Sequence, residues 1–316
     1  MSTYIIHRLL YGAFVVFCVI TVVFFALHLA PGDPIDMLLP PDASGAAGQQ
    51  LADQLRRRYG LDQPIHVQYV QYLQRLAHFD MGESIRSGRP VAGELLRLYP
   101  ATIELTLVSL LIAGVIGISA GVLSAVFKKR ALDSLSMTAA LVGVSIPNFV
   151  LGLLLMLLFA LHLGWLPPSG RDGPIWSGGS IRYIILPAIT LGTSAAAILA
   201  RLSRSAMLDV LGEDYIRTAR AKGLRARSVI ARHAFRNAMI PIITVVGLQF
   251  GGLLAGAVIA ETIFAWPGVG RFLIISITGN DFPAVQGAVL CIAVLFVLVN
   301  LLVDLTYAVI DPRIRY

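Results

Sequence analysis

Long stretches of the chain carry no charged side chain, and they are the strongest structural signal in the sequence. A helix needs about 20 apolar residues to cross the hydrocarbon core of a bilayer. Windows free of Asp, Glu, Lys and Arg cover residues 9–30, 106–127, 134–163, 183–200, 237–260 and 282–303. The pattern therefore predicts six membrane-spanning helices.

Composition agrees with this pattern. Hydrophobic residues make up 57% of the chain and charged residues 14%, whereas a soluble domain carries about 25% charged residues. These values exclude a disordered protein, a coiled coil and most soluble enzymes. The first apolar window has 22 residues, which is too long for the apolar core of a signal peptide. We expect it to end as a helix at Pro31-Gly32-Asp33-Pro34.

The charges between the windows alternate from one side of the membrane to the other. The chain start, the residues near 128–133, the segment 201–236 and the tail together hold 15 basic and 5 acidic residues. The remaining connections hold 10 basic and 11 acidic residues. By the positive-inside rule both termini are cytoplasmic. The net charge of +7 therefore reports membrane orientation, and nucleic acid is not an expected partner.

The third window is unusual in length and contains a proline. Its 30 residues would make a helix about 45 Å long, so we expect it to tilt or to leave the membrane near Pro147. Pro187 and Pro241 lie inside two other windows. Each proline removes a backbone donor and kinks a helix. Such kinks serve either packing or the shape of a transport path.

The longest polar stretch, residues 31–100, is predicted to lie outside the cell. Residues 40–48 are expected to form a loop, while 51–59 and 64–79 are expected to form helices. In the second helix one apolar face lies along the surface of the membrane; it comprises Tyr69, Val70, Leu73, Leu76 and Ala77. The region is either a lid on the outer mouth or a docking surface for an external partner.

The cytoplasmic segment 201–236 holds nine basic residues and two predicted helices. Glu213-Asp214-Tyr215 places acids at the positive end of the first helix. Gly223 suits the left-handed residue that ends it, and a second basic helix is expected over 225–236. A short helix of small residues suits either a groove on another protein or a layer of lipid head groups.

The segment Glu213–Leu224 resembles the "EAA" coupling loop of ABC-importer permeases. The general pattern is Glu-Ala-Ala, three residues and Gly; here the first three positions are Arg217-Thr218-Ala219, and Gly223 has the expected spacing. The replacement of the glutamate by Arg217 resembles the form of this loop in the dipeptide and oligopeptide branch of that family.

Further motifs of this family occur in order along nearly the whole chain. They are Gly60-Leu61-Asp62-Gln63-Pro64, Gly82-Glu83-Ser84, Ser145-Ile146-Pro147-Asn148-Phe149, Leu186-Pro187-Ala188, Arg201-Leu202-Ser203-Arg204, Arg236-Asn237-Ala238-Met239-Ile240-Pro241, Glu261 to Arg271, and Asp311-Pro312-Arg313-Ile314-Arg315.

The chain thus resembles the first-permease (B-type) subunit of dipeptide, oligopeptide, glutathione and nickel importers. This resemblance implies an all-α polytopic membrane protein of the type I importer (MetI-like) fold, with six transmembrane helices and both termini inside. It divides the chain into an N-terminal transmembrane helix (1–30), an extracytoplasmic helical region (31–100) and a permease core (101–316) whose coupling loop is 201–236.

The resemblance also implies the function. The chain would form half of a pathway for di- and oligopeptides in the bacterial inner membrane, or carry glutathione or chelated nickel in the same role. Its partners would be a second homologous permease, two ATP-binding subunits or one fused subunit, an extracytoplasmic solute-binding protein and lipid. Neither catalytic residues nor a metal or cofactor site are expected, and ATP and Mg would bind the partner subunits.

The motifs of other classes are missing from the sequence. There is no GxxxxGK[ST] phosphate loop, no HExxH, no GxSxG and no pair of aspartates inside the spans. These absences argue against an intramembrane enzyme. The large basic inner loop and the lack of charged sites in the spans argue against a self-sufficient secondary transporter.

By the same resemblance, the coupling helix sits in a groove of the ATP-binding subunit. Tyr215, Thr218 and Ala219 are expected to fill the groove, and Gly223 to supply the turn. Arg217, Arg220 and Lys222 are expected to meet acids or lipid phosphates. The full coupling set is Asp214, Tyr215, Ile216, Arg217, Thr218, Ala219, Arg220, Ala221, Lys222, Gly223 and Leu224.

A second candidate site lies at the outer end of the fifth window. Glu261 is followed by Pro267, Gly268 and Gly270, which interrupt a helix, so we expect a short re-entrant segment at the outer gate. Glu261 would meet a peptide amino group, lock the gate to Arg271, or serve only as a structural ion pair. The residues nominated for the gate and path are Asn148, Ser194, Gln249, Glu261, Trp266 and Arg271.

Overall fold

The computed structural model describes residues 2–29, 32, 34–35, 39 and 46–310. Within these ranges the chain is helical and contains no β-strand. Pro31 and Asp33 of the predicted helix stop, most of the predicted loop 40–48 and the closing motif 311–315 lie outside the described residues.

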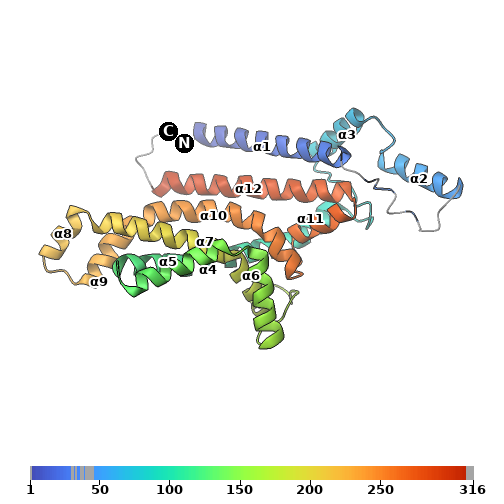
Figure 1. Ribbon diagram of the computed structural model, residues 1–316. Coiled ribbons are helices and arrows are strands. Elements are labelled where there is room, and N and C mark those ends of the chain that lie inside the picture. Colours follow the sequence, from blue (N-terminus) through green and yellow to red (C-terminus); the bar gives the residue numbers. More distant parts are fainter. Residues whose placement is uncertain (1, 30–31, 33, 36–38, 40–45, 311–316) are drawn as a thin grey trace. The chain divides into compact units, whose positions relative to one another are not determined.

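Helices occur at all the apolar windows (Figure 1), but several extend beyond them: α4 (Val91–Val126) begins 15 residues before its window, inside the region expected to be extracytoplasmic. Their bounds are α1 Ser2–Leu29, α2 Ala46–Tyr59, α3 Ile65–Ala77, α4 Val91–Val126, α5 Ala131–Ser145, α6 Asn148–Leu155, η1 Met156–His162, η2 Ile175–Ser177, α7 Ile181–Leu211, α8 Asp214–Ala221, α9 Ala226–Ser228, η3 Val229–Ala234, α10 Phe235–Ile263, α11 Val269–Thr278 and α12 Phe282–Ile310.

Five helices of the described chain are long and apolar enough to cross a membrane, and a bent pair makes up to six spans. The pair joins α5 to the helix Asn148–His162 at an angle of 103°. Ile146, the residue before Pro147, is extended, as the clash with a following proline requires. The third window is therefore broken at Pro147, whereas Pro187 and Pro241 lie inside continuous helices.

The contacts divide the chain into two units, residues 1–100 with 268–297, and residues 101–267 with 298–316. In the first unit, α3 packs on α1. Tyr72 is buried against Ile20 and Phe24, and burial raises the pKa of its hydroxyl. Of the stripe predicted to lie on the membrane surface, Tyr69, Leu73 and Leu76 instead pack beside Tyr72 against α1, while Val70 is half exposed.

A buried carboxylate fixes the connection between α3 and α4 in the same unit. Asp281 precedes α12 and is 3% exposed. It accepts hydrogen bonds from Ser84 Oγ at 2.5 Å and from the amide of Ile85 at 3.1 Å. It also accepts one from the amide of Ala284 at 3.3 Å, which caps α12. One side chain therefore holds both the loop and the helix start.

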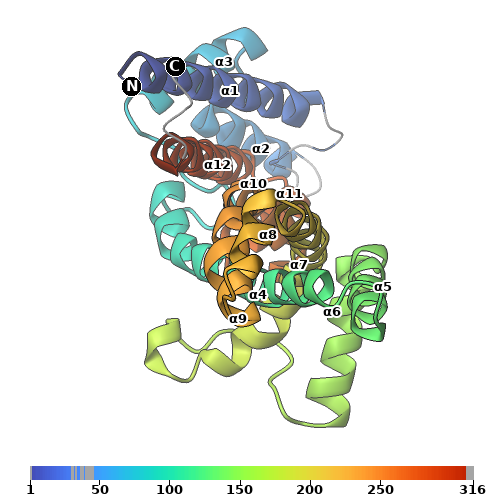
Figure 2. The same ribbon diagram turned by 90° about the vertical axis from the view of Figure 1, so that its left-hand side faces the viewer.

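In the second unit α7 is the central helix, and α4, α5 and α10 pack around it (Figure 2). Alanines and a glycine make much of its buried surface. Gly117 and Gly121 of α4 lie so close to α7 that a Cβ on either would overlap a carbonyl oxygen, that of Ala196 or of Ala200. Small residues of this kind allow membrane helices to approach backbone to backbone.

Asp133 joins the turn between α4 and α5 to α7. Its carboxylate accepts hydrogen bonds from Ser124 Oγ at 2.6 Å, from Arg204 Nε at 2.8 Å and from the amide of Lys129 at 2.9 Å. Arg204 Nη2 donates a further one at 3.0 Å, so the arginine binds both oxygens, an arrangement with defined geometry. This contact fixes α7 near the end that leads to α8.

The close approach of α4 and α7 predicts opposite outcomes for two glycines of α4. Gly121→Ala should lower the free energy of unfolding by about 1–3 kcal/mol, the usual cost of overpacking. Gly114→Ala is the matched control because a Cβ there would contact nothing within 4 Å; it should be neutral or stabilise by up to about 1 kcal/mol. Thermal unfolding of the full chain in one detergent measures both, and equal effects would contradict this packing.

Candidate functional site

The predicted coupling segment forms one short helix, α8. It begins at Asp214, three residues after α7 ends at Leu211, and runs for eight residues. Asp214 lies in its first turn and Arg220 in its last, which places each charge at the favourable end of the helix dipole.

Gly223 ends this helix as predicted. Its φ is +77°, the left-handed conformation in which glycine is favoured. The amide of Gly223 donates to Arg220 O at 3.0 Å, and that of Leu224 donates to Ala219 O at 3.4 Å; this pair of bonds is the Schellman motif. A Cβ on Gly223 would meet nothing within 4 Å, so the requirement for glycine is conformational and not steric.

One face of α8 packs into the chain itself. Ile216 is fully buried and Ala219 is 8% exposed, and helical spacing places both on one side. They join a core formed with residues of α7, η3 and α10, which include Met207, Val229 and Ala238. The expectation that Ala219 fills a groove on a partner is therefore wrong: Ala219 helps to attach α8 to its own chain.

The opposite face of α8 is open. Tyr215 is 41% exposed, and its hydroxyl accepts a hydrogen bond from Asn237 Nδ2 at 2.8 Å. Arg217 pairs with Asp214 at 3.3 Å, an exposed pair that adds little stability. The other exposed members of the predicted set are Thr218, Arg220, Ala221, Lys222, Gly223 and Leu224.

The helix that follows is continuous with the fifth span. The basic helix expected over 225–236 occurs and runs directly into the fifth span, because α9, η3 and α10 form one helical stretch, Ala226–Ile263. Consequently α8 is connected through one turn to α10, and its buried face also contacts α7. Any displacement of α8 acts on both helices.

Two residues nominated for the gate are fully buried at the other end of α10. Glu261 accepts a hydrogen bond from Thr102 Oγ1 at 2.6 Å, and both groups are buried. The indole Nε1 of Trp266 donates to the carbonyl oxygen of Ala101 at 2.9 Å. Both residues therefore attach the end of α10 to the same turn of α4.

Two charged residues that the sequence analysis did not nominate complete this cluster. Arg171 Nη2 pairs with Glu104 Oε2 at 2.7 Å, and the two side chains are 15% and 9% exposed. The guanidinium carbon also lies 5.6 Å from the centre of the Trp266 ring, within range of a cation–π interaction. The signal in the sequence was Glu104 itself, because an acid beside a long apolar run usually has a partner.

The remaining nominated residues lie on α6, α7, α10 and α11. Ser194 Oγ donates to Asn148 Oδ1 at 2.7 Å, a hydrogen bond between α7 and α6 of the kind common in membrane bundles. Gln249 is half-buried on α10, and Arg271 is half-buried on α11. The interruption of the helix between Ile263 and Val269 occurs as predicted, and the Glu261–Arg271 lock stays a prediction. Among the described residues no cluster of metal-ligating side chains occurs.

Comparison with known proteins agrees with this architecture. The family described as "Binding-protein-dependent transport system inner membrane component" matches residues 117–316, and its N-terminal companion matches residues 1–106. The glutathione transport system permease protein GsiC of Escherichia coli (strain K12) is 43% identical over 316 residues, which cover 100% of both chains. The same protein of Salmonella paratyphi A is also 43% identical over the same length.

A solved structure shares the fold. The inward-facing MetNI methionine ABC transporter aligns with 69% of this chain and 96% of its own, with a TM-score of 0.57 and 19% identity. The family matches and the full-length relatives together lead to one conclusion: the chain belongs to the binding-protein-dependent transport system inner membrane components and is a multi-pass permease subunit of an ABC importer, not an enzyme.

Proposed function

We propose that this permease forms half of the translocation pathway for short peptides, with glutathione as the first candidate. The observation that carries the proposal is identity to a permease whose name states glutathione transport, over the full length of both chains. Glutathione is itself a tripeptide, so it falls within the peptide class that the sequence motifs indicate. A second permease, ATP-binding subunits and a solute-binding protein would complete the importer.

Within this proposal α8 transmits the movement of the ATP-binding subunits. Its exposed face, with Tyr215 and Thr218, would contact the partner, while Ile216 and Ala219 connect it to α7 and α10. Because these residues share one packed core, a displacement of α8 is resisted by side-chain packing and passes to both helices. Alternating access then follows from two arrangements of packed helices.

Uptake measurements test the substrate class. We expect vesicles that contain the importer and its co-purifying solute-binding protein to accumulate labelled glutathione or trialanine when ATP is enclosed with the ATP-binding subunits. Accumulation should be absent without ATP. Uptake of a free sugar or a single amino acid, with neither peptide taken up, would contradict the proposal.

The turn at Gly223 gives a sharper test of coupling. Gly223→Val should reduce uptake at least tenfold while the chain still inserts, because a β-branched residue disfavours the left-handed conformation. Gly223→Asn should retain most uptake because asparagine tolerates that conformation. ATP hydrolysis that remains fully stimulated by substrate in the valine variant would show that this turn is not part of the coupling.

The buried position of Glu261 favours a structural role over a substrate contact. Glu261→Gln keeps an acceptor for Thr102, so peptide uptake should stay within about twofold of the unmodified importer. Thr102→Val should lower the melting temperature because it removes a hydrogen bond from a buried carboxylate. Loss of uptake in Glu261→Gln at an unchanged melting temperature would instead assign the carboxylate to the gate or the substrate.

A further inference from the structure

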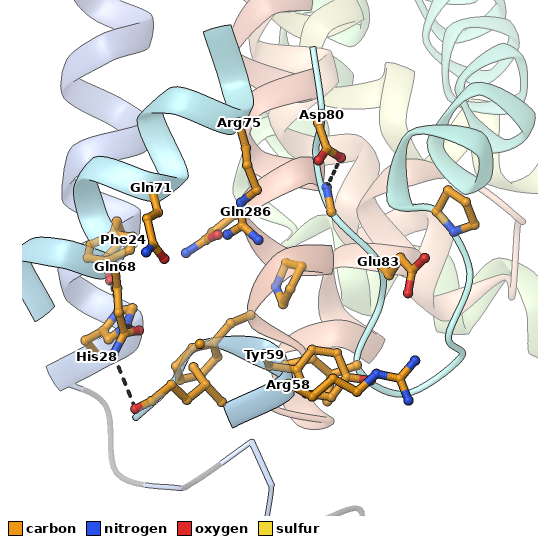
Figure 3. A pocket seen from close by; sticks show the side chains of 17 residues that line it. Phe24, His28, Arg58, Tyr59, Gln68, Gln71, Arg75, Asp80, Glu83 and Gln286 are labelled. Carbon is orange, nitrogen blue, oxygen red and sulfur yellow. Dashed lines mark hydrogen bonds between the residues drawn. The ribbon is translucent and has the colours of Figure 1, made fainter. Parts of the chain in front are cut away.

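The first unit contains a cavity of about 430 Å³ that the proposed transport mechanism does not use. It lies between the end of α1, the end of α2, α3, the loop before α4 and the start of α12 (Figure 3). Its volume is within the range of small-molecule sites in proteins. The segment 31–100, which forms much of the wall, is the region predicted to face the outside of the cell.

One wall of the cavity presents three polar side chains without partners. Arg75 and Gln71 come from α3 and Gln286 from α12, and Figure 3 shows them on the same side of the cavity. Their side chains make no hydrogen bond or ion pair within the described part of the chain. Gln286 is 8% exposed as a residue, but its amide atoms are not among the buried polar atoms that lack a partner, so they remain accessible from the cavity. The neighbouring Gln68, by contrast, donates to Gln63 O at 2.7 Å.

Two carboxylates also line the cavity. Glu83 lies across from Gln71, and Asp80 lies near Arg75 (Figure 3). The amide of Gly82 donates to Asp80 Oδ1 at 2.8 Å, so this carboxylate is held in place. With Arg58 also on the wall, two guanidinium groups and two carboxylates line the space. Balanced charge suits a zwitterion better than a polyanion or a simple cation.

Apolar side chains form the rest of the lining. They are Phe24, Ile85, Phe282 and Pro283, and Phe24 and Phe282 are almost fully buried. Ligand sites in proteins usually have a largely apolar lining with a few polar groups that fix the orientation of the ligand.

We infer that this cavity binds the zwitterionic form of a short peptide, with its carboxylate at Arg75, Gln71 and Gln286 and its amino group toward Asp80 and Glu83. An arginine with two flanking amide donors matches the geometry of a carboxylate. The inference rests on the proposed function only for the choice of a peptide as ligand. It adds a binding site in the outer region that is formed by this chain alone.

Equilibrium binding to the assembled importer tests the site. Labelled dialanine is added to the two permeases with their ATP-binding subunits, in the absence of ATP and of the solute-binding protein. We expect dialanine to bind, and we expect dialanine amide and N-acetyl dialanine each to bind at least tenfold more weakly. These measurements use the unmodified protein. No binding of dialanine, or equal binding of dialanine and its amide, would overturn the inference.

Variants locate the binding. Arg75→Gln and Glu83→Gln should each weaken dialanine binding at least tenfold, whereas Arg57→Gln, an exposed residue of α2 outside the cavity, should leave it unchanged. Gln71→Leu serves if Arg75→Gln does not fold. Unchanged binding in folded Arg75→Gln or Gln71→Leu would place the ligand elsewhere and overturn the assignment.

The result is separable from the proposed function. ATP-driven peptide uptake by an importer that binds no dialanine would remove this site and leave the transport role intact. Binding of dialanine to an importer that takes up no peptide would support this site and remove the proposed transport role. A third outcome is that dialanine does not bind and that Arg75→Gln weakens the binding of the solute-binding protein to the importer. The cavity would then receive a carboxylate of that protein, and the inference would fail.

Discussion

The contact of α4 with α7 is the constraint on which the second unit depends. Helices in a bilayer gain little from the hydrophobic effect, so their association relies on close packing and hydrogen bonds. Gly117 and Gly121 permit this packing because no side chain separates the two backbones, and a Cβ on Gly192 of α7 would likewise lie only 2.7 Å from the carbonyl oxygen of Ser109. Both candidate sites are attached to these two helices: α8 follows α7, and the Glu261 cluster is anchored on residues 101–104 of α4.

Polar contacts attach the helices of the second unit to one another near both of their ends. Near α8, Asp133 and Arg204 fix the turn between α4 and α5 to α7. At the other end, Trp266 and Glu261 bind residues 101–102. The helices are thus held by specific polar contacts where they end and by small residues in between. Such attachment is what the proposed coupling role of α8 would require, because a movement of α8 could then pass to the helices that it packs against.

Much of this architecture was predictable from the chain because its causes are local. Six apolar windows have the length that a bilayer imposes, and Gly223 has the spacing and type of residue that a left-handed helix end needs. The same local logic found the boundaries of α8 within about three residues. The break at Pro147 was visible as excess length, although the angle of 103° depends on packing.

The predictions that differ from the structure concern the direction in which side chains point and the residues that they contact, and both depend on tertiary packing. Ala219 was assigned to a groove on a partner because it is small, but its i, i+3 relation to Ile216 places it in the core. The predicted apolar face of α3 contained Tyr69, Leu73 and Leu76, which pack with α1, but it omitted Tyr72, which is buried against Phe24. Arg171 and Glu104 were counted only as charges, because nothing in the local sequence shows that residues 67 positions apart form an ion pair.

The helix α8 packs against its own chain with one face, and we propose that its opposite face contacts the ATP-binding subunit. Site-specific cross-linking in the assembled importer tests this directly, with cysteine placed at Thr218 or at Ala219 in a chain whose Cys18 and Cys291 are replaced by serine. A short cross-linker should join position 218 to the ATP-binding subunit and should leave position 219 unreacted. A product from position 219 together with no product from position 218 would contradict the two-faced helix.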